Sequence, residues 1–247
     1  MKVGLISYNT VWEEILLNAK NIKEIIEEVA IYDLDLLIFP EMSLFGFSMN
    51  TGEIDMLKLI EADKIIRDTL SLYSLDLIIG TPIIEGDNIY NGLVFYAGSN
   101  KIIHNKSRLF EYSGEHYSYC KSIDGVTLFN NFALSICFEL RFPELFVRDR
   151  LRYKQIVNIA NWPITRINHY ELLCAARAVE NQCFVFCVNR SGSDMNVDYG
   201  EGYAEIFDFN GKKLQSYIEL NKHGKIKLFN VDQTTLTEFR SKFNFYG

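Results

Sequence analysis

Residues 132–144 read Phe-Ala-Leu-Ser-Ile-Cys-Phe-Glu-Leu-Arg-Phe-Pro-Glu, an apolar run that leads into a thiol and then a proline. The alternation of side chains predicts a β-strand over residues 132–138, with Cys137 on its small-residue face. Pro143 suits the first turn of a helix, so we expect a helix over residues 143–153. Open α/β sheets place their sites at the carboxyl ends of strands, which is where this prediction puts Cys137. Taken alone, a single cysteine is more often a buried, inert residue.

The same alternation of strands and helices extends to both sides of this stretch. Apolar runs predict strands over residues 2–9, 35–39, 76–80, 88–96, 101–104, 155–160, 183–188, 203–209 and 225–231. Helical spacing of apolar residues predicts helices over residues 15–29, 57–72 and 168–181. We expect the last two strands to flank a turn at Asn210-Gly211. Because no linker-like segment interrupts the pattern, the sequence predicts a single α/β domain over residues 1–247, built of stacked sheets flanked by helices.

Composition places the chain among ordinary globular proteins. Of its 247 residues, 48% are apolar and 23% are charged, which excludes disordered, collagen-like and coiled-coil chains. The 25 basic and 32 acidic residues give a net charge of −7 without a long basic run, so we expect no nucleic-acid partner. No apolar stretch reaches the ~18 residues that span a bilayer, and we predict a cytoplasmic protein with no membrane partner. Five scattered cysteines indicate free thiols in a reduced compartment.

Two charged residues directly follow predicted strands. Glu41 comes after the apolar run 36–39 and Pro40, where an ionised side chain is uncommon unless the protein uses it. A solvated loop glutamate is an equally good interpretation of its position. Lys106 lies just beyond the strand over residues 101–104, and a solvated lysine is the ordinary interpretation there.

Other chemistries have less support in the sequence. His104, His116 and His169 are alternative partners for a thiol, as in Cys–His hydrolases, but none lies in a local signature of those enzymes. Cys183 and Cys187 are four positions apart, which on a strand separates their side chains by roughly 13 Å, too far to share a zinc ion. The glycines form no phosphate-binding loop. We therefore predict no metal and no other cofactor.

Three short motifs occur together: Phe39-Pro40-Glu41, Lys106 in Lys-Ser-Arg-Leu-Phe, and Cys137 in Ile-Cys-Phe-Glu-Leu-Arg-Phe-Pro-Glu. These motifs have the order and sequence context found in the nitrilase, or carbon–nitrogen hydrolase, superfamily. The chain resembles this superfamily from residue 2 to about residue 231. Further matching segments lie at residues 160–163, 166–169, 172–182 and 188–192. The resemblance implies a four-layer α-β-β-α sandwich, commonly paired into dimers across helices near the active site.

The chemistry of amide hydrolysis gives each motif a role. Cys137 would attack the carbonyl carbon, and Glu41 would accept and return the proton. Lys106 and the backbone N–H of Phe138 would stabilise the oxyanion. By resemblance, Glu115 would orient Lys106. The ends of the predicted strands add residues that could line the pocket, although capping, packing and surface ion pairing explain them equally well: Arg141, Phe142, Asn161 and Trp162.

Residues 41–50 and 114–119 resemble most the ω-amidase branch, which includes the YafV-type amidases. This resemblance implies hydrolysis of small amides with a carboxylate at the far end, such as 2-oxoglutaramate or 2-oxosuccinamate, through a cysteine thioester. The fork of Arg141 could bind that carboxylate at two points. Glu41, Lys106 and Cys137 form the catalytic triad that the resemblance implies. Three departures from the family pattern could alter the geometry around this triad or the substrate range: Arg108 for a usual His, Glu139 for a frequent Asp, and Ala204 for a common Ser.

Two alternatives stay open at this point. Another carbon–nitrogen hydrolase, such as an N-carbamoyl amino acid hydrolase or a nitrilase, would use the same triad. A catalytically silent binding scaffold of the same fold is the alternative outside enzymes, and the presence of Glu41, Lys106 and Cys137 together argues against it. The Ala-rich face of the helix over residues 168–181 favours a homodimer or a larger homo-oligomer.

Overall fold

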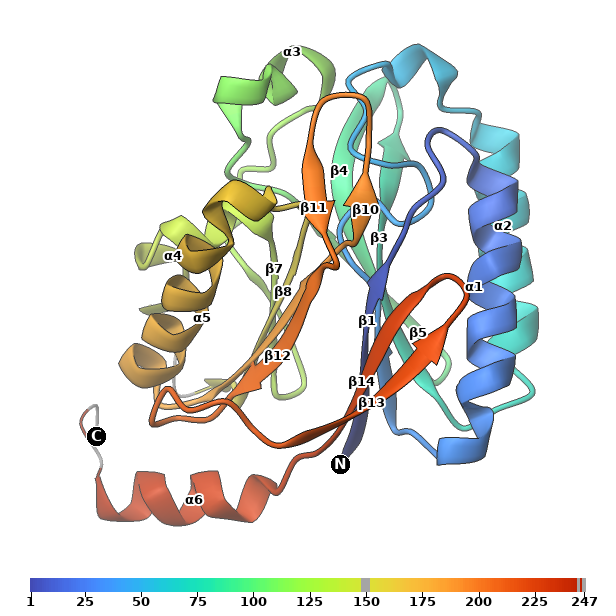
Figure 1. The fold of residues 1–247 in the computed structure, drawn as a ribbon. Coiled ribbons are helices and arrows are strands. Elements are labelled where there is room, and N and C mark those ends of the chain that lie inside the picture. Colours follow the sequence, from blue (N-terminus) through green and yellow to red (C-terminus); the bar gives the residue numbers. More distant parts are fainter. Residues whose placement is uncertain (148–151, 244, 246–247) are drawn as a thin grey trace.

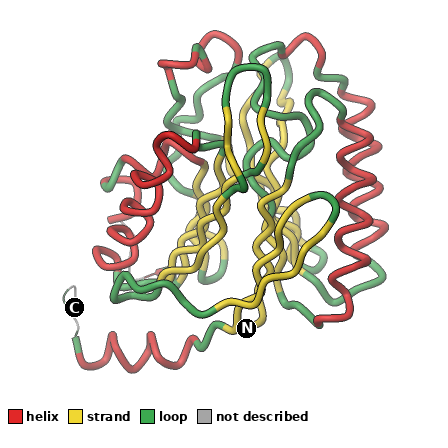
Figure 2. The backbone as a smooth tube through the Cα atoms, viewed as in Figure 1, coloured by secondary structure: helices red, strands yellow, loops and turns green. Residues whose placement is uncertain are grey.

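Two β-sheets lie face to face, with helices outside each of them (Figure 1). The computed structural model describes residues 1–147, 152–243 and 245. Helices α1 (Ile15–Val29) and α2 (Met56–Leu70) cover the outer face of one sheet, whereas α4 (Glu144–Val147) and α5 (Ile167–Asn181) lie outside the other. Figure 2 shows the strands of both sheets between these two groups of helices. The predicted α-β-β-α sandwich is confirmed.

The larger sheet has seven strands in the order β13-β14-β1-β2-β3-β4-β5. In chain order they are β1 (Lys2–Tyr8), β2 (Leu36–Ile38), β3 (Asp76–Glu85), β4 (Asn88–Ala97), β5 (Asn100–Asn105), β13 (Ser216–Asn221) and β14 (Gly224–Asn230). β1, β2 and β3 are parallel, and the remaining pairs are antiparallel. The parallel centre follows from α1 and α2, because parallel neighbours need a crossover connection.

The smaller sheet has five strands in the order β12-β9-β8-β7-β6. In chain order they are β6 (Thr127–Phe129), β7 (Phe132–Ile136), β8 (Gln155–Ala160), β9 (Phe184–Asn189) and β12 (Tyr203–Phe207). β7, β8 and β9 are parallel, as are the three central strands of the larger sheet. Both sheets therefore direct the carboxyl ends of their parallel strands into loops, where α/β folds build their sites.

Side-chain alternation explains how one strand serves two layers of the sandwich. Leu36 and Ile38 of β2 belong to the core between the sheets, whereas Leu37 and the following Phe39 belong to the core under α1 and α2. Successive strand residues point to opposite faces, so a strand buried on both sides needs an unbroken apolar run. All three residues of β2 are buried, as this run predicts.

Four details of the sequence-based assignment are wrong. β7 ends at Ile136, one residue before Cys137, because a short 3-10 helix begins there (Cys137–Arg141). Of the predicted helix over residues 143–153, the structure describes α4 and shows no α-helix at residues 152 and 153, while residues 148–151 lie outside the described part of the chain. β12 and β14 do not form a hairpin around Asn210-Gly211, since they belong to different sheets.

The fourth detail concerns elements that the pattern did not indicate. The expected loop over residues 191–202 contains a small hairpin of β10 (Gly192–Ser193) and β11 (Asp198–Gly200). Beyond the sheets, α3 (Glu115–Ser118) precedes the smaller sheet and α6 (Gln233–Lys242) follows β14, with the Asp232 side chain capping α6. These are short or mostly polar elements, so their apolar periodicity is weak.

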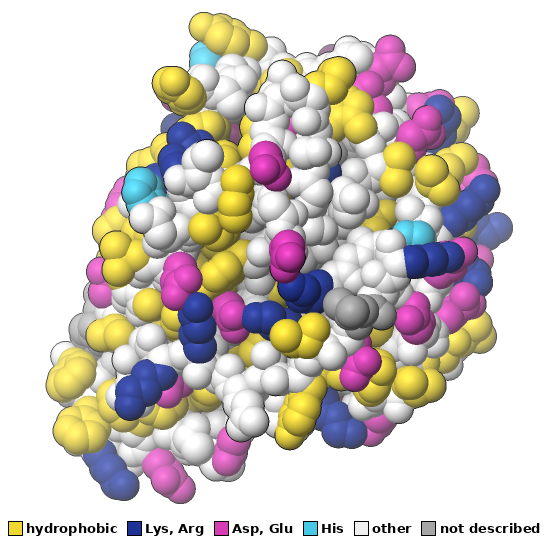
Figure 3. All heavy atoms as spheres, viewed as in Figure 1, with side chains coloured by type: hydrophobic (Ala, Val, Ile, Leu, Met, Phe, Trp, Pro, Cys, Tyr) yellow, Lys and Arg dark blue, Asp and Glu magenta, His cyan; other side chains and the backbone are white. Residues whose placement is uncertain are grey.

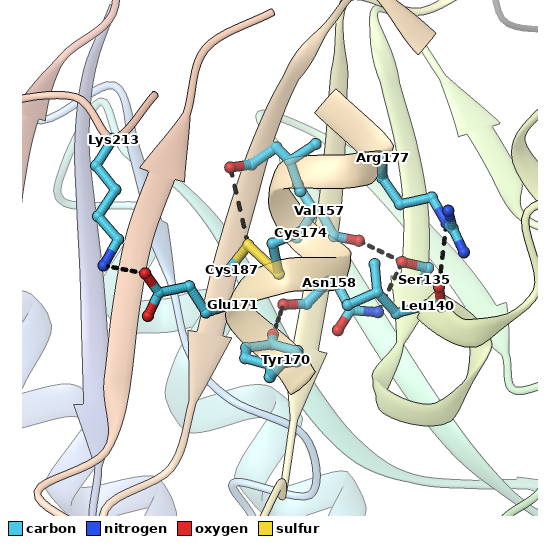
Figure 4. Close-up of a disulfide and its surroundings, with 11 residues drawn as sticks. Ser135, Leu140, Val157, Asn158, Tyr170, Glu171, Cys174, Arg177, Cys187 and Lys213 are labelled. Carbon is cyan, nitrogen blue, oxygen red and sulfur yellow. Dashed lines mark hydrogen bonds and ion pairs between the residues drawn. A yellow bond between two sulfur atoms is a disulfide. The ribbon is translucent and has the colours of Figure 1, made fainter. Parts of the chain in front are cut away.

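A disulfide joins Cys174 of α5 to Cys187 of β9 (Figure 4). Both residues are fully buried in the core beneath α5. Cys120, Cys137 and Cys183 are free. The expectation of free thiols throughout is therefore wrong for this pair. The two cysteines come together because α5 packs on β9, and the spacing of cysteines in the sequence does not show this packing.

The surface carries charges of both signs. On the face drawn in Figure 3, Lys and Arg side chains are interspersed with Asp and Glu.

Among the described residues, no helix is both long enough and apolar enough to cross a bilayer.

Candidate active site

Glu41, Lys106 and Glu115 form a buried ion-pair cluster just beyond the ends of two strands of the larger sheet. Glu41 follows β2, Lys106 follows β5, and Glu115 begins α3. Lys106 Nζ lies 2.9 Å from Glu41 Oε1 and 3.0 Å from Glu115 Oε1, and all three side chains are fully buried. Burial alone would lower the pKa of Lys106, but the Glu115 and Glu41 carboxylates raise it above its ordinary value. The ammonium therefore stays charged between two carboxylates.

Asn91 of β4 completes this cluster. Its Nδ2 atom donates to Glu41 Oε1 at 2.7 Å and to Glu115 Oε1 at 2.8 Å. The same two oxygens contact Lys106 Nζ, so the amide and the ammonium hold the two carboxylates from either side. The backbone N–H of Phe110 also donates to Glu115 Oε2, at 2.5 Å. The sequence gives no signal for Asn91, which looks like an ordinary polar residue within a strand.

The backbone around Glu41 is fixed by close packing against β3. Gly80 has no side chain, and a Cβ atom there would lie 2.3 Å from the backbone nitrogen of Met42. Met42 itself has a positive φ of 53°, which turns the chain sharply after Glu41. The Gly80 N–H donates to the Pro40 carbonyl at 3.2 Å. The glycine thus allows the carboxylate-bearing turn to lie directly on the neighbouring strand.

Cys137 stands at a strained turn between β7 and the 3-10 helix. Its φ of 46° lies in the left-handed region, which is costly for a residue with a Cβ atom. The residue is 9% exposed. Burial and the Glu41 carboxylate raise the pKa of its thiol well above the ordinary value, while Lys106 and the backbone of Asn161 oppose that rise. The resting sulfur is therefore a protonated thiol at neutral pH.

Glu139 anchors this turn from within. Its Oε2 atom accepts from the Ile136 backbone N–H at 2.7 Å and lies 2.8 Å from His104 Nε2. Its Oε1 atom accepts from the N–H and the hydroxyl of Ser107 at 2.6 and 2.7 Å. One buried carboxylate thereby connects the residue before Cys137 to the residue after Lys106. Glu139, which stands where the family frequently has Asp, therefore has hydrogen-bond partners at both of its carboxylate oxygens.

A pocket of about 380 Å³ opens above Cys137. Five of the expected residues line it: Cys137, Phe138, Arg141, Asn161 and Trp162. Phe142 does not, contrary to expectation; it lines a neighbouring pocket, where Arg108 stacks on its ring at 5.3 Å. The pocket is also lined by residues to which the sequence analysis gave no role in it: Phe110, Tyr112, Pro163 and Arg166.

The other candidates lie in different surroundings. His104 contacts Glu139 and the Thr127 hydroxyl, and His169 lies 3.5 Å from Arg141. Ala204 is buried in β12 opposite Val188. Within the described ranges, no group of three or more His, Cys, Asp and Glu side chains is arranged to hold a metal ion.

Comparison with known proteins gives consistent matches across most of the chain. The sequence matches the family described as carbon-nitrogen hydrolase over residues 2–240. It is 28% identical to an omega-amidase YafV of Yersinia enterocolitica, covering 98% of this chain and 94% of that protein. It is 29% identical to the 2-oxoglutaramate amidase of Bacillus subtilis, covering 73% and 72%.

Solved structures agree with this match at the level of the fold. A CN-hydrolase superfamily protein from Xanthomonas campestris superposes with a TM-score of 0.86 at 24% identity, over 99% of this chain and 95% of that one. Nit3 of Saccharomyces cerevisiae, described as a member of the nitrilase superfamily, gives a TM-score of 0.84 at 20% identity, over 100% and 95%.

Proposed function

The chain belongs to the carbon–nitrogen hydrolase family, and from that premise we propose that it is an ω-amidase-like enzyme. It hydrolyses the terminal amide of a small acid such as 2-oxoglutaramate, giving ammonia and the dicarboxylic acid. The observation that carries the proposal is the buried Glu41–Lys106–Glu115 cluster beside Cys137 at the base of a pocket. Four side chains that are costly to bury together indicate chemistry rather than packing.

Cys137 is the proposed nucleophile. Because burial keeps its thiol protonated, attack on the amide carbon requires a base that takes the proton as the C–S bond forms. Glu41 is that base. As the carbonyl double bond opens, its electrons move to oxygen, where Lys106 and the Phe138 N–H stabilise the negative charge.

The tetrahedral intermediate then expels nitrogen. Glu41 returns its proton to the leaving amine, the C–N bond breaks, and ammonia departs from a thioester on Cys137. In the second half, Glu41 takes a proton from water, whose oxygen attacks the thioester carbon. The C–S bond breaks as Glu41 gives that proton to the sulfur, and the acid leaves. Glu115 holds Lys106 in place through both halves.

The substrate's carboxylate is placed in the outer part of the pocket. Arg141 lies on the lining with its guanidinium 4.9 Å from the centre of the Trp162 ring. Stacking on an aromatic face leaves the edge of the guanidinium, with its N–H groups, directed at a ligand. Asn161, Trp162 and Phe138 supply part of the remaining walls.

The names of the relatives support the amidase assignment over its alternatives within the family. An omega-amidase and a 2-oxoglutaramate amidase match this chain at 28% and 29% identity. An N-carbamoyl amino acid hydrolase would release carbon dioxide with ammonia, and a nitrilase would act on nitriles. A silent scaffold would have no reason to keep the buried cluster intact.

Three further parts of the proposal concern the molecule as a whole. Residues 1–247 form one catalytic domain, and it works without a metal or other cofactor. Two copies pair through α5, whose Leu172 and Val179 side chains are 69% and 51% exposed. Exhaustive chelation that abolishes turnover, with recovery on adding one divalent ion, would contradict the second part.

A substrate screen tests the function directly. Ammonia release is measured for 2-oxoglutaramate, 2-oxosuccinamate, glutamine, an N-carbamoyl amino acid, a nitrile and a neutral aliphatic amide. We expect the two 2-oxo-acid amides to give the highest kcat/KM. Faster turnover of the neutral amide or the nitrile would overturn the substrate class while leaving the triad in place, and no turnover of any compound would favour the silent scaffold.

A further inference from the structure

A second arginine, Arg166, lines the same pocket as Arg141. It ends the short 3-10 helix that precedes α5 and is half-buried. Among the described residues that line the pocket, Arg141 and Arg166 are the only charged side chains, and both are cations. These two side chains therefore give the pocket lining a charge of +2.

Aromatic rings hold both guanidiniums in place. Arg166 lies over the Phe110 ring at 5.5 Å, and Arg141 lies over the Trp162 ring at 4.9 Å. Trp162 Nε1 in turn donates to the Arg166 carbonyl at 2.9 Å. The rings and the backbone thus connect the two arginines around the rim, which fixes the position of each cation before a ligand arrives.

Neither guanidinium forms an ion pair with a carboxylate in the described part of the chain. Arg141 has one polar neighbour of note, the His169 ring at 3.5 Å. Burial lowers the pKa of Arg141, and the Arg166 charge lowers it further, so the two cations interact electrostatically. Two like charges held this way are unfavourable until anionic or acceptor groups lie between them.

We propose that Arg166 is a specificity-determining residue, which with Arg141 selects substrates carrying two adjacent oxygen acceptors and rejects those with an ammonium group. Arg141 binds the carboxylate, and Arg166 donates to the oxygen on the neighbouring carbon. A 2-oxo acid has both acceptors. A 2-amino acid instead places a positive charge beside Arg166, where repulsion opposes binding. This inference rests on the proposed amidase function for its kinetic readout.

One arginine is enough to bind a carboxylate, so the presence of a second one in the pocket needs its own explanation. A single fork satisfies both oxygens of a carboxylate, so Arg141 alone accounts for an anionic substrate. The donors of Arg166 then need a further acceptor on the substrate. An acid without one leaves those donors partly desolvated and unpaired, which reduces affinity.

The kinetic test compares Arg166→Gln and Arg166→Lys with the parent enzyme. The substrates are 2-oxoglutaramate, glutaric acid monoamide, which lacks the oxo group, and glutamine. We expect Arg166→Gln to lower kcat/KM for 2-oxoglutaramate by about 10- to 100-fold, mainly through KM, which is the range of a lost hydrogen bond from a charged donor. The monoamide should change less, and the preference for 2-oxoglutaramate over glutamine should fall. Arg166→Lys should recover part of the loss.

A matched control uses an arginine outside the pocket. Arg67 on α2 pairs with Asp63 at 2.9 Å on the surface, and Arg67→Gln should leave all three values unchanged. If Arg166→Gln lowers kcat/KM equally for all three substrates, its preference for 2-oxoglutaramate is unchanged. That result would show a structural role for Arg166 and overturn the proposal.

A binding test keeps the inference separate from the reaction. Calorimetry on Cys137→Ala measures 2-oxoglutarate, glutarate and L-glutamate, with and without Arg166→Gln. We expect 2-oxoglutarate to bind most tightly and to lose about 10- to 100-fold in affinity with Arg166→Gln. If the enzyme hydrolyses no amide but this order of binding holds, the proposed function fails and the role of Arg166 stands. If amides are hydrolysed and the three acids bind alike, only the role of Arg166 fails.

Discussion

The backbone N–H of Asn161 donates to Glu41 Oε2 at 2.7 Å, although the two residues are 120 positions apart in the chain. The Asn161 side chain also donates to the Glu41 carbonyl at 3.1 Å. Glu41 follows a strand of the larger sheet and Asn161 follows a strand of the smaller one. The proposed base is therefore oriented only when both sheets have folded and packed together.

Replacing Cys137 by Ala should abolish ammonia release and leave the fold intact. The change removes the nucleophile and only one buried heavy atom, so little cavity forms. The measurement is turnover with mass spectrometry of the intact chain, which should show no acyl adduct. The free Cys120 offers the control, since Cys120→Ala should retain turnover. Near-normal activity in Cys137→Ala would disprove the assignment.

Replacing Glu41 by Gln should stop the reaction while preserving the shape of the site. The amide cannot accept the thiol proton, so the attack or the later hydrolysis should slow by about 10²–10⁴-fold, the usual effect of a general base. Rapid-quench mass spectrometry shows which half fails: a persistent adduct on Cys137 indicates slow hydrolysis, and no adduct indicates slow attack. Glu144→Gln, at a surface carboxylate, serves as the control. Equal rates in Glu41→Gln and the parent would exclude Glu41 as the base.

Replacing Lys106 by Met should reduce both turnover and stability. Loss of an oxyanion donor costs about 10²–10³-fold in rate. Removing the ammonium also leaves Glu41 and Glu115 buried without their cation, and breaking a buried pair typically costs about 3–5 kcal/mol in free energy of unfolding. Turnover and urea denaturation measure the two effects. Lys101→Met, which removes a partly exposed partner of Asp63, should change stability far less.

Ionised Glu139 should make the protein sensitive to acid. Burial would raise its pKa, but His104 and Ser107 hold the pKa below the ordinary value of 4.5. A lowered pKa in the folded state gives stability that is complete above 4.5 and is lost as the pH falls through the folded value.

The corresponding variant is Glu139→Gln, compared with the parent by thermal unfolding between pH 3 and pH 7. One of its two polar atoms becomes an NH2 group that faces donors instead of accepting from them, so the variant should be less stable at pH 7. Its stability should also fall less steeply below pH 4.5, because the group no longer titrates. Parallel curves for the two proteins would show that Glu139 contributes nothing to the acid response.

The chain should form dimers in solution through α5. Light scattering at micromolar concentration should give twice the 28.6 kDa of one chain. Leu172→Glu places a charge on the exposed face of α5 and should shift the mass toward the monomer. A monomer mass for the parent protein across this range would contradict pairing.

The parts of the structure that follow from local patterns were predictable. The apolar run before Glu41 predicts β2, because a strand buried on both faces is apolar throughout. The spacing of isoleucines predicts α1, because a helix buried on one face has apolar residues every three to four positions. The positive φ of Cys137 was not predictable, since a residue with a Cβ atom rarely adopts it by local preference. Asn91 and Arg166 join the site only through tertiary packing.

The pairing of β14 with β1 has a consequence for biosynthesis. β1 is synthesised about 220 residues before the strand that completes its hydrogen bonds, which begins at Gly224. At translation rates of 5–20 residues per second, the nascent sheet waits roughly 10–45 s with an open edge. An open edge is a template for pairing with other chains. Until β14 is translated, the nascent chain therefore exposes the unpaired edge of β1 to pairing with other chains.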